Sequence, residues 1–71
     1  MSYEIRKIGF LPPFYYKPVV KQHGRTFVQN TTFRNRGLAV ESAELMEAIL
    51  YAKESRYINA DWLDTIGWRE E

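Results

Sequence analysis

Residues 15–29, YYKPVVKQHGRTFVQ, decide the fold that this sequence predicts. Their β-branched and aromatic side chains favour strands. Between the two halves lies His23-Gly24, a short polar pair whose glycine tolerates the positive φ of a tight hairpin turn. With a two-residue loop, the register joins Gln22 with Arg25, Val20 with Phe27, and Val19 with Val28. We therefore expect an antiparallel hairpin centred on His23-Gly24.

Pro18 limits how this hairpin can pair. In the two-residue-loop register Pro18 faces Gln29 at a hydrogen-bonded position, and proline has no N–H to donate. Either the pairing stops at Val19 or the loop is four residues long, and both solutions make residues 15–20 an edge strand. Residues 3–10, YEIRKIGF, form a further strand. We therefore expect this first strand, if it joins the sheet, to pair with the second strand of the hairpin.

The sequence after Phe33 predicts a change from strands to helix. Residues 34–37, RNRG, favour a turn, and residues 38–40, LAV, favour a short fourth strand. Ser42 then caps a helix that runs to about Ser55. The expected buried face of this helix consists of Leu45, Met46, Ile49 and Ala52, widened by Leu50 and Tyr51.

A second, shorter helix follows. Asn59 is a good cap for residues 60–66, ADWLDTI, and Gly67 is well placed to end them. Trp68 lies beyond this stop, at an exposed end of the chain. The predicted fold class is α+β: a small twisted antiparallel sheet of three to four strands, covered by one main helix, with a short C-terminal helical turn. We expect a single domain over residues 1–71.

The charges divide unequally along the chain. Residues 1–40, mostly β, hold seven Lys and Arg residues against Glu4 alone, a net charge of +6. Residues 41–71, mostly helical, hold eight acids against three cations, a net charge of −5. The two halves can complement each other within one fold. They can also support head-to-tail contacts between copies, or contact of a basic face with nucleic acid.

The residues that carry chemistry in other proteins are sparse here. His23 is the only imidazole and lies in a predicted turn, where a solvated side chain is the simpler interpretation. Asp61 and Asp64 are three residues apart on a short helix, so they share a face that we expect to be wet. No phosphate-binding glycine motif occurs. We predict no catalytic residue, no cofactor, no metal and no small-molecule substrate, and therefore a protein that is not an enzyme.

Composition favours association with another protein. A chain of 71 residues buries a small core, and without cysteine it has no disulfide to support that core. Eleven aromatic residues suit contact with a partner, either itself or another protein. The first twenty residues carry charges where a signal peptide needs an apolar run, and we expect no membrane partner. We expect a soluble chain in a host cytoplasm or in a virion.

Two sets of residues are candidates for binding. A sheet covered on one side leaves Tyr15, Lys17, Val19 and Val28 on its open face. The predicted protein-binding residues are Phe14, Tyr15, Tyr16, Lys17, Val19, Trp68 and Arg69. A basic β-ribbon can instead lie on phosphates, and the residues for this alternative are Lys17, Lys21, Arg25, Arg34 and Arg36. The simpler interpretation of these cations is that they prevent edge-to-edge aggregation.

Residues 26–61 contain a β-ribbon, a Phe-x-Asn-x-Gly turn at residues 33–37, a short strand, an acidic cap at residues 41–42 and a helix rich in Glu, Leu and Ala. This order resembles small virion-associated proteins from the head and neck modules of tailed bacteriophages. The resemblance implies a structural accessory component, repeated around a symmetric particle and bound to capsid or connector protein. The alternatives are a small phage- or mobile-element-encoded inhibitor that blocks a host protein and, third, a nucleic-acid-binding module.

Overall fold

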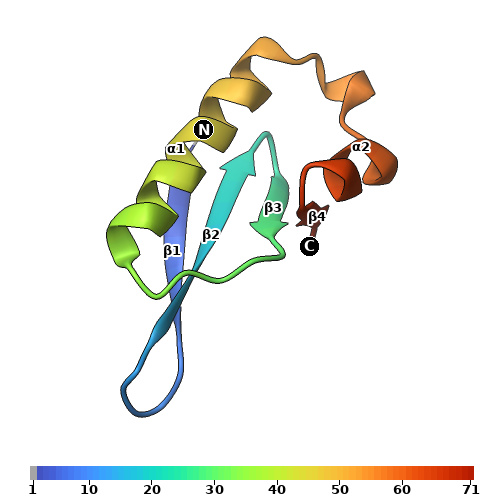
Figure 1. Ribbon diagram of the computed structural model, residues 1–71. Coiled ribbons are helices and arrows are strands. Elements are labelled where there is room, and N and C mark those ends of the chain that lie inside the picture. Colours follow the sequence, from blue (N-terminus) through green and yellow to red (C-terminus); the bar gives the residue numbers. More distant parts are fainter. Residues whose placement is uncertain (1) are drawn as a thin grey trace.

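The computed structural model describes residues 2–71. The elements in chain order are β1 (Ser2–Ile8), β2 (Tyr15–Gln22), β3 (Arg25–Gln29), α1 (Arg36–Ala52), the 3-10 turn η1 (Ser55–Tyr57), α2 (Ala60–Thr65) and β4 (Trp68–Glu70). The strands form one antiparallel sheet in the order β1-β2-β3-β4, and α1 and α2 lie against it (Figure 1). The predicted α+β fold, with one main helix and a short second helix, is confirmed.

The central hairpin has the two-residue loop, with pairing that stops at Val19, which is the first of the two alternatives that the sequence left open. His23 and Gly24 both have positive φ, 48° and 76°, as a two-residue hairpin turn demands. β2 and β3 pair from Gln22 with Arg25 to Val19 with Val28. Side chains alternate between the two faces of a sheet, so Val20 and Phe27 share one face while Val19 and Val28 share the other. The turn therefore fixes which side chains enter the core.

β2 is an internal strand, and the prediction of an edge strand was wrong. β1 pairs with β2 over its whole length, with Ile5 opposite Pro18. The β2–β3 ladder ends at Val19, so β3 needs no hydrogen bond from the nitrogen of Pro18. On the other side of Pro18 from Val19, Tyr16 exchanges two backbone hydrogen bonds of 2.7 and 2.8 Å with Phe33. Proline blocks only the edge toward which its nitrogen points, and β1 occupies the other edge.

α1 begins at Arg36, six residues before Ser42, which the sequence predicted as its N-cap. Asn35 is the N-cap, and its side chain accepts a 2.7 Å hydrogen bond from the N–H of Gly37. The chain bends at residues 34 and 35, within the predicted turn, but residues 36 and 37 already belong to the helix. The predicted strand at residues 38–40 was wrong, because the capping side chain of Asn35 starts a helix there instead. The helix ends at Ala52, three residues before the predicted end.

The buried face of α1 agrees with the prediction at Met46 and Leu50 and differs from it at the other predicted positions. Its members follow a 4-3-4 spacing and are Ala39, Ala43, Met46 and Leu50. Leu45 is 64% exposed, and Ile49 is 38% exposed. The two alanines let the helix backbone lie close to the sheet, and the alanine at 39 belongs to the first turn that the prediction assigned to a strand. Because the prediction left this first turn out of the helix, it placed the buried face of α1 too far round the helix axis.

The C-terminal segment packs back onto the sheet. Asn59 caps α2 by accepting a 2.9 Å hydrogen bond from the N–H of Trp62, and Gly67 follows with φ 82°, as predicted. Trp68 is only 4% exposed, so the prediction of an exposed end was wrong. It lies in β4 opposite Gln29. The core joins Val20, Phe27, Ala43, Met46, Leu50, Ile58, Leu63 and Trp68.

Candidate functional site

The β1–β2 hairpin projects beyond the rest of the molecule (Figure 1). Its strands pair from Ser2 with Lys21 to Ile8 with Tyr15, and residues 9–14, the hairpin tip, connect them. This projection contributes to an elongated shape of 40 × 20 × 18 Å. At the tip Phe10 is 95% exposed and Leu11 is 71% exposed. Two large apolar side chains are therefore exposed to solvent at the far end of a hydrogen-bonded ribbon.

Cations surround the base of this tip. The Lys7 ammonium lies 3.9 Å from the centroid of the Phe14 ring, and the Arg34 guanidinium lies 5.8 Å from that of Tyr15. Lys17 belongs to β2 on the opposite face of the hairpin from Lys7. Among the described residues, no carboxylate forms an ion pair with Lys7, Lys17 or Arg34, which we call the basic collar. No acid occurs between residues 5 and 40, so the collar is a region of positive potential.

A second apolar surface lies along α1. Leu38 is 51% exposed, and it shares one side of the helix with Leu45 and Ile49. Beside it is a groove of about 170 Å³, the helix groove, lined by Gln29, Ser42, Leu45, Met46, Ile49, Ile66 and Trp68. The Ser42 hydroxyl donates a hydrogen bond to the side-chain oxygen of Gln29 within it. The groove is thus mostly apolar, with one satisfied polar pair in its wall.

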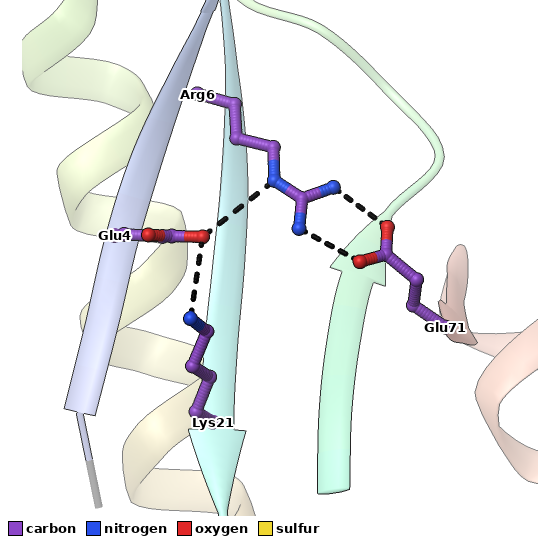
Figure 2. A network of polar contacts seen from close by, with 4 residues as sticks. All are labelled: Glu4, Arg6, Lys21 and Glu71. Atoms are coloured by element: carbon purple, nitrogen blue, oxygen red, sulfur yellow. Dashed lines mark hydrogen bonds and ion pairs between the residues drawn. The ribbon is translucent and has the colours of Figure 1, made fainter.

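The other face of the sheet is covered by charged side chains (Figure 2). The Arg6 guanidinium donates hydrogen bonds of 2.6 and 2.7 Å to the two carboxylate oxygens of Glu71. Glu4 lies 3.6 Å from both Arg6 and Lys21. The hydrogen bonds from Arg6 hold the pKa of the Glu71 carboxyl below its usual value, and they raise the pKa of Arg6. These four residues, the charged cover, link β1, β2 and the chain after β4.

Val19 and Val28 lie on the same face of the sheet as the charged cover and are 0% exposed. The prediction that this valine pair forms an open apolar face was therefore wrong. Long aliphatic stems cover apolar surface while their charged ends stay in water, and Arg6 and Lys21 supply two such side chains here. Phe14, Tyr15, Tyr16 and Lys17 are half-buried, and Arg69 is exposed opposite Val28. The predicted protein-binding residues thus do not form one exposed surface.

Two of the five candidate nucleic-acid residues are engaged with carboxylates. Arg25 donates hydrogen bonds of 3.0 and 2.7 Å to Glu70 and another of 3.0 Å to the carbonyl oxygen of Ile58. Its hydrogen bonds lower the pKa of the Glu70 carboxyl. Lys21 is held by Glu4 in the charged cover. Lys17, Arg34 and Arg36 form no ion pair within residues 2–71. A phosphate backbone would have to compete for two of the five cations.

The titratable residues considered from the sequence lie apart. His23 is exposed in the hairpin turn and borders a surface hollow beside the end of α1. Asp61 and Asp64 are exposed on α2 and border a different hollow, with Trp68 and Arg69. Residues 2–71 bring no three metal-ligating side chains together. Within the same residues, no helix has the length and hydropathy that crossing a bilayer requires.

Sequence reasoning missed the exposure of Phe10 and Leu11 at the hairpin tip. The run IGFLPPFYY, the longest without a charge, was the available signal. Gly9 has φ 119° within it, which fits a chain reversal between two strands. Gly9 and the prolines could have been used to predict a second hairpin here, with Phe10 and Leu11 in its turn and therefore exposed to solvent.

Comparisons of this chain with protein-family models, with curated proteins and with solved structures give no match.

Proposed function

We propose that this chain is a non-enzymatic interaction protein that binds a partner protein through its hairpin tip. The observation that carries the proposal is the exposure of Phe10 and Leu11, 95% and 71%, at the end of a paired ribbon. Exposed apolar side chains at a projecting site are typical of contact surfaces rather than of solvent surfaces. The paired strands hold the two ends of the tip in place before binding, which lowers the entropy lost on association.

The chemistry of the tip defines the partner. An apolar pocket is needed for Phe10 and Leu11, and carboxylates at its rim would meet Lys7 and Lys17 of the basic collar. Apolar anchors within a polar rim are the common anatomy of protein interfaces. A component repeated in a symmetric assembly, with capsid or connector protein as partner, is the specific role that the resemblance of residues 26–61 implies. A blocked host protein is the alternative partner for the same surface.

Site-specific photo-cross-linking tests this proposal. A photoreactive amino acid at position 10 should give a discrete cross-linked product in cells that produce the natural partner. The matched control is position 51, since Tyr51 is 85% exposed on α1 but lies away from the tip. The product should map to an apolar pocket bordered by acids, and Leu11→Ser should reduce its yield. Equal labelling from positions 10 and 51 would contradict the proposal.

A further inference from the structure

The hairpin tip projects from the molecule (Figure 1), whereas the helix groove is a hollow in its surface. The tip is convex and presents Phe10 and Leu11, whereas the groove of about 170 Å³ is concave. Leu45 and Ile49 line the groove and remain 64% and 38% exposed. Each surface exposes apolar atoms whose transfer out of water is favourable. A single contact between the two would remove both from water.

The charges around the two surfaces are opposite in sign. The basic collar stands behind the tip. After Arg36, α1 carries only acidic charges, at Glu41, Glu44 and Glu47. Glu41 is three residues after Leu38 and four before Leu45, so its exposed carboxylate lies on the same side of the helix as the apolar stripe. A tip that entered the groove would bring the collar toward this carboxylate.

The tip and the groove of one chain cannot meet. The hairpin carries its tip away from α1 and α2 (Figure 1). The groove is lined by residues of β3 and α1 and by Ile66 and Trp68 after α2. We propose that the tip of one copy occupies the helix groove of a second copy, so that chains associate head to tail. This proposal rests on the proposed role of the tip as a binding element and names its partner. Such a heterologous contact leaves one tip and one groove free, so association continues into a ring or a filament.

Sedimentation equilibrium of the purified chain tests the proposal. The average mass should rise with concentration from the 8.4 kDa of one chain to beyond that of a dimer. The tip variant, Phe10→Ser with Leu11→Ser, and the groove variant, Leu45→Ser with Ile49→Ser, should each lower the association constant more than about tenfold. Tyr51→Ser is the matched control and should leave association unchanged. All the altered side chains are exposed, and circular dichroism checks that each variant is folded.

Mixing the two variants gives the decisive result. The tip variant keeps an intact groove, and the groove variant keeps an intact tip, so together they should form a 1:1 dimer that grows no further. If two α1 stripes paired symmetrically instead, the tip variant alone would still dimerise, and the mixture would not restore association. That pattern would overturn the proposal.

A monomeric mass at every accessible concentration would also overturn the proposal. The proposed function fails separately from it. If position 10 cross-links to a different protein while the purified chain stays monomeric, binding through the tip stands and the second copy as partner is excluded. If position 10 yields no specific product and the chain is monomeric, both proposals fail.

Discussion

The two faces of the sheet reach the same burial by different means. Val19 and Val20 are adjacent in β2 and point to opposite faces, yet both are 0% exposed. Val20 lies in the apolar core with residues of α1 and α2. Val19 and Val28 share the opposite face with the charged cover (Figure 2). An apolar layer protects one face, and ion-paired side chains protect the other.

This difference matters because the two kinds of cover respond differently to change. Side chains packed in a core lose contacts when an atom is removed, since the surrounding structure relaxes only partly. Long charged side chains are held by weaker, solvent-exposed interactions and can move to fill a gap. We therefore expect substitutions on the helix-covered face to cost more stability than equivalent ones beneath the charged cover, and changes of pH to act mainly on exposed ion pairs.

Phe27→Ala should have the largest effect. Phe27 is the largest of the fully buried side chains and belongs to the core cluster. Loss of a buried phenylalanine costs about 3–5 kcal/mol, which is comparable to the whole stability of roughly 3–5 kcal/mol expected for so small a core. Circular dichroism should show a largely unfolded chain. Phe27→Leu retains most of the apolar volume and should stay folded, with a loss of about 1–2 kcal/mol in urea unfolding. A fully stable Phe27→Ala protein would contradict this assignment of the core.

The pair Val20→Ala and Val19→Ala compares the faces directly. The two substitutions remove the same atoms from neighbouring positions of equal exposure. Val20→Ala should lower the free energy of unfolding by about 2–3 kcal/mol, the transfer term plus a cavity term. Val19→Ala should lower it by about 1–1.5 kcal/mol, because the charged side chains above can settle into the space. Urea titrations monitored by tryptophan fluorescence measure both values. Equal losses of unfolding free energy would show that both faces are equally rigid.

The sequence was sufficient to predict some of the features that depend on local chemistry, although it missed the Asn35 cap of α1. The His23-Gly24 turn and the Asn59 cap with Gly67 follow from residue preferences within a few positions. The position of β2 in the sheet depends on where β3 stops beside Pro18, which is a matter of tertiary pairing. The strand propensities of single residues do not determine which strands pair with each other.

The candidate site was harder to predict for a related reason. The sequence places Val19 on the face that no helix covers, but the bond from Arg6 to Glu71 spans 65 positions and closes that face. Trp68 likewise looks exposed after a helix stop until β4 pairs with β3. Conversely, Leu45 fits a helical stripe but is 64% exposed, because the sheet covers a neighbouring side of α1. The exposure of an apolar residue depends on long-range contacts, and a single sequence does not determine which contacts form.

Substitutions of Arg6 separate the charge of the cover from its bulk. Arg6→Met keeps an aliphatic stem above the sheet and removes the bonds to Glu71. Arg6→Ala removes both. Because the pair is exposed, each substitution should cost less stability than Val19→Ala, and Arg6→Ala should cost more than Arg6→Met. Urea unfolding at neutral pH measures the order. Equal losses would mean that the stem contributes nothing to covering Val19 and that the ion pair acts alone.

Acid should act on the ion pairs of both faces. The pKa of Glu70 is lowered by hydrogen bonds from Arg25, and that of Glu71 by hydrogen bonds from Arg6, relative to an ordinary value of 4.5. A carboxyl whose pKa is lower in the folded state stabilises the fold above its unfolded pKa, and this stabilisation is lost as the pH falls through the folded value. The urea midpoint should therefore decrease modestly between about pH 6 and pH 3. Glu70→Gln with Glu71→Gln removes both carboxylates, so its midpoint should be lower at neutral pH and change less on acidification. A double variant with the same pH dependence as the parent chain would assign the acid sensitivity to other carboxylates.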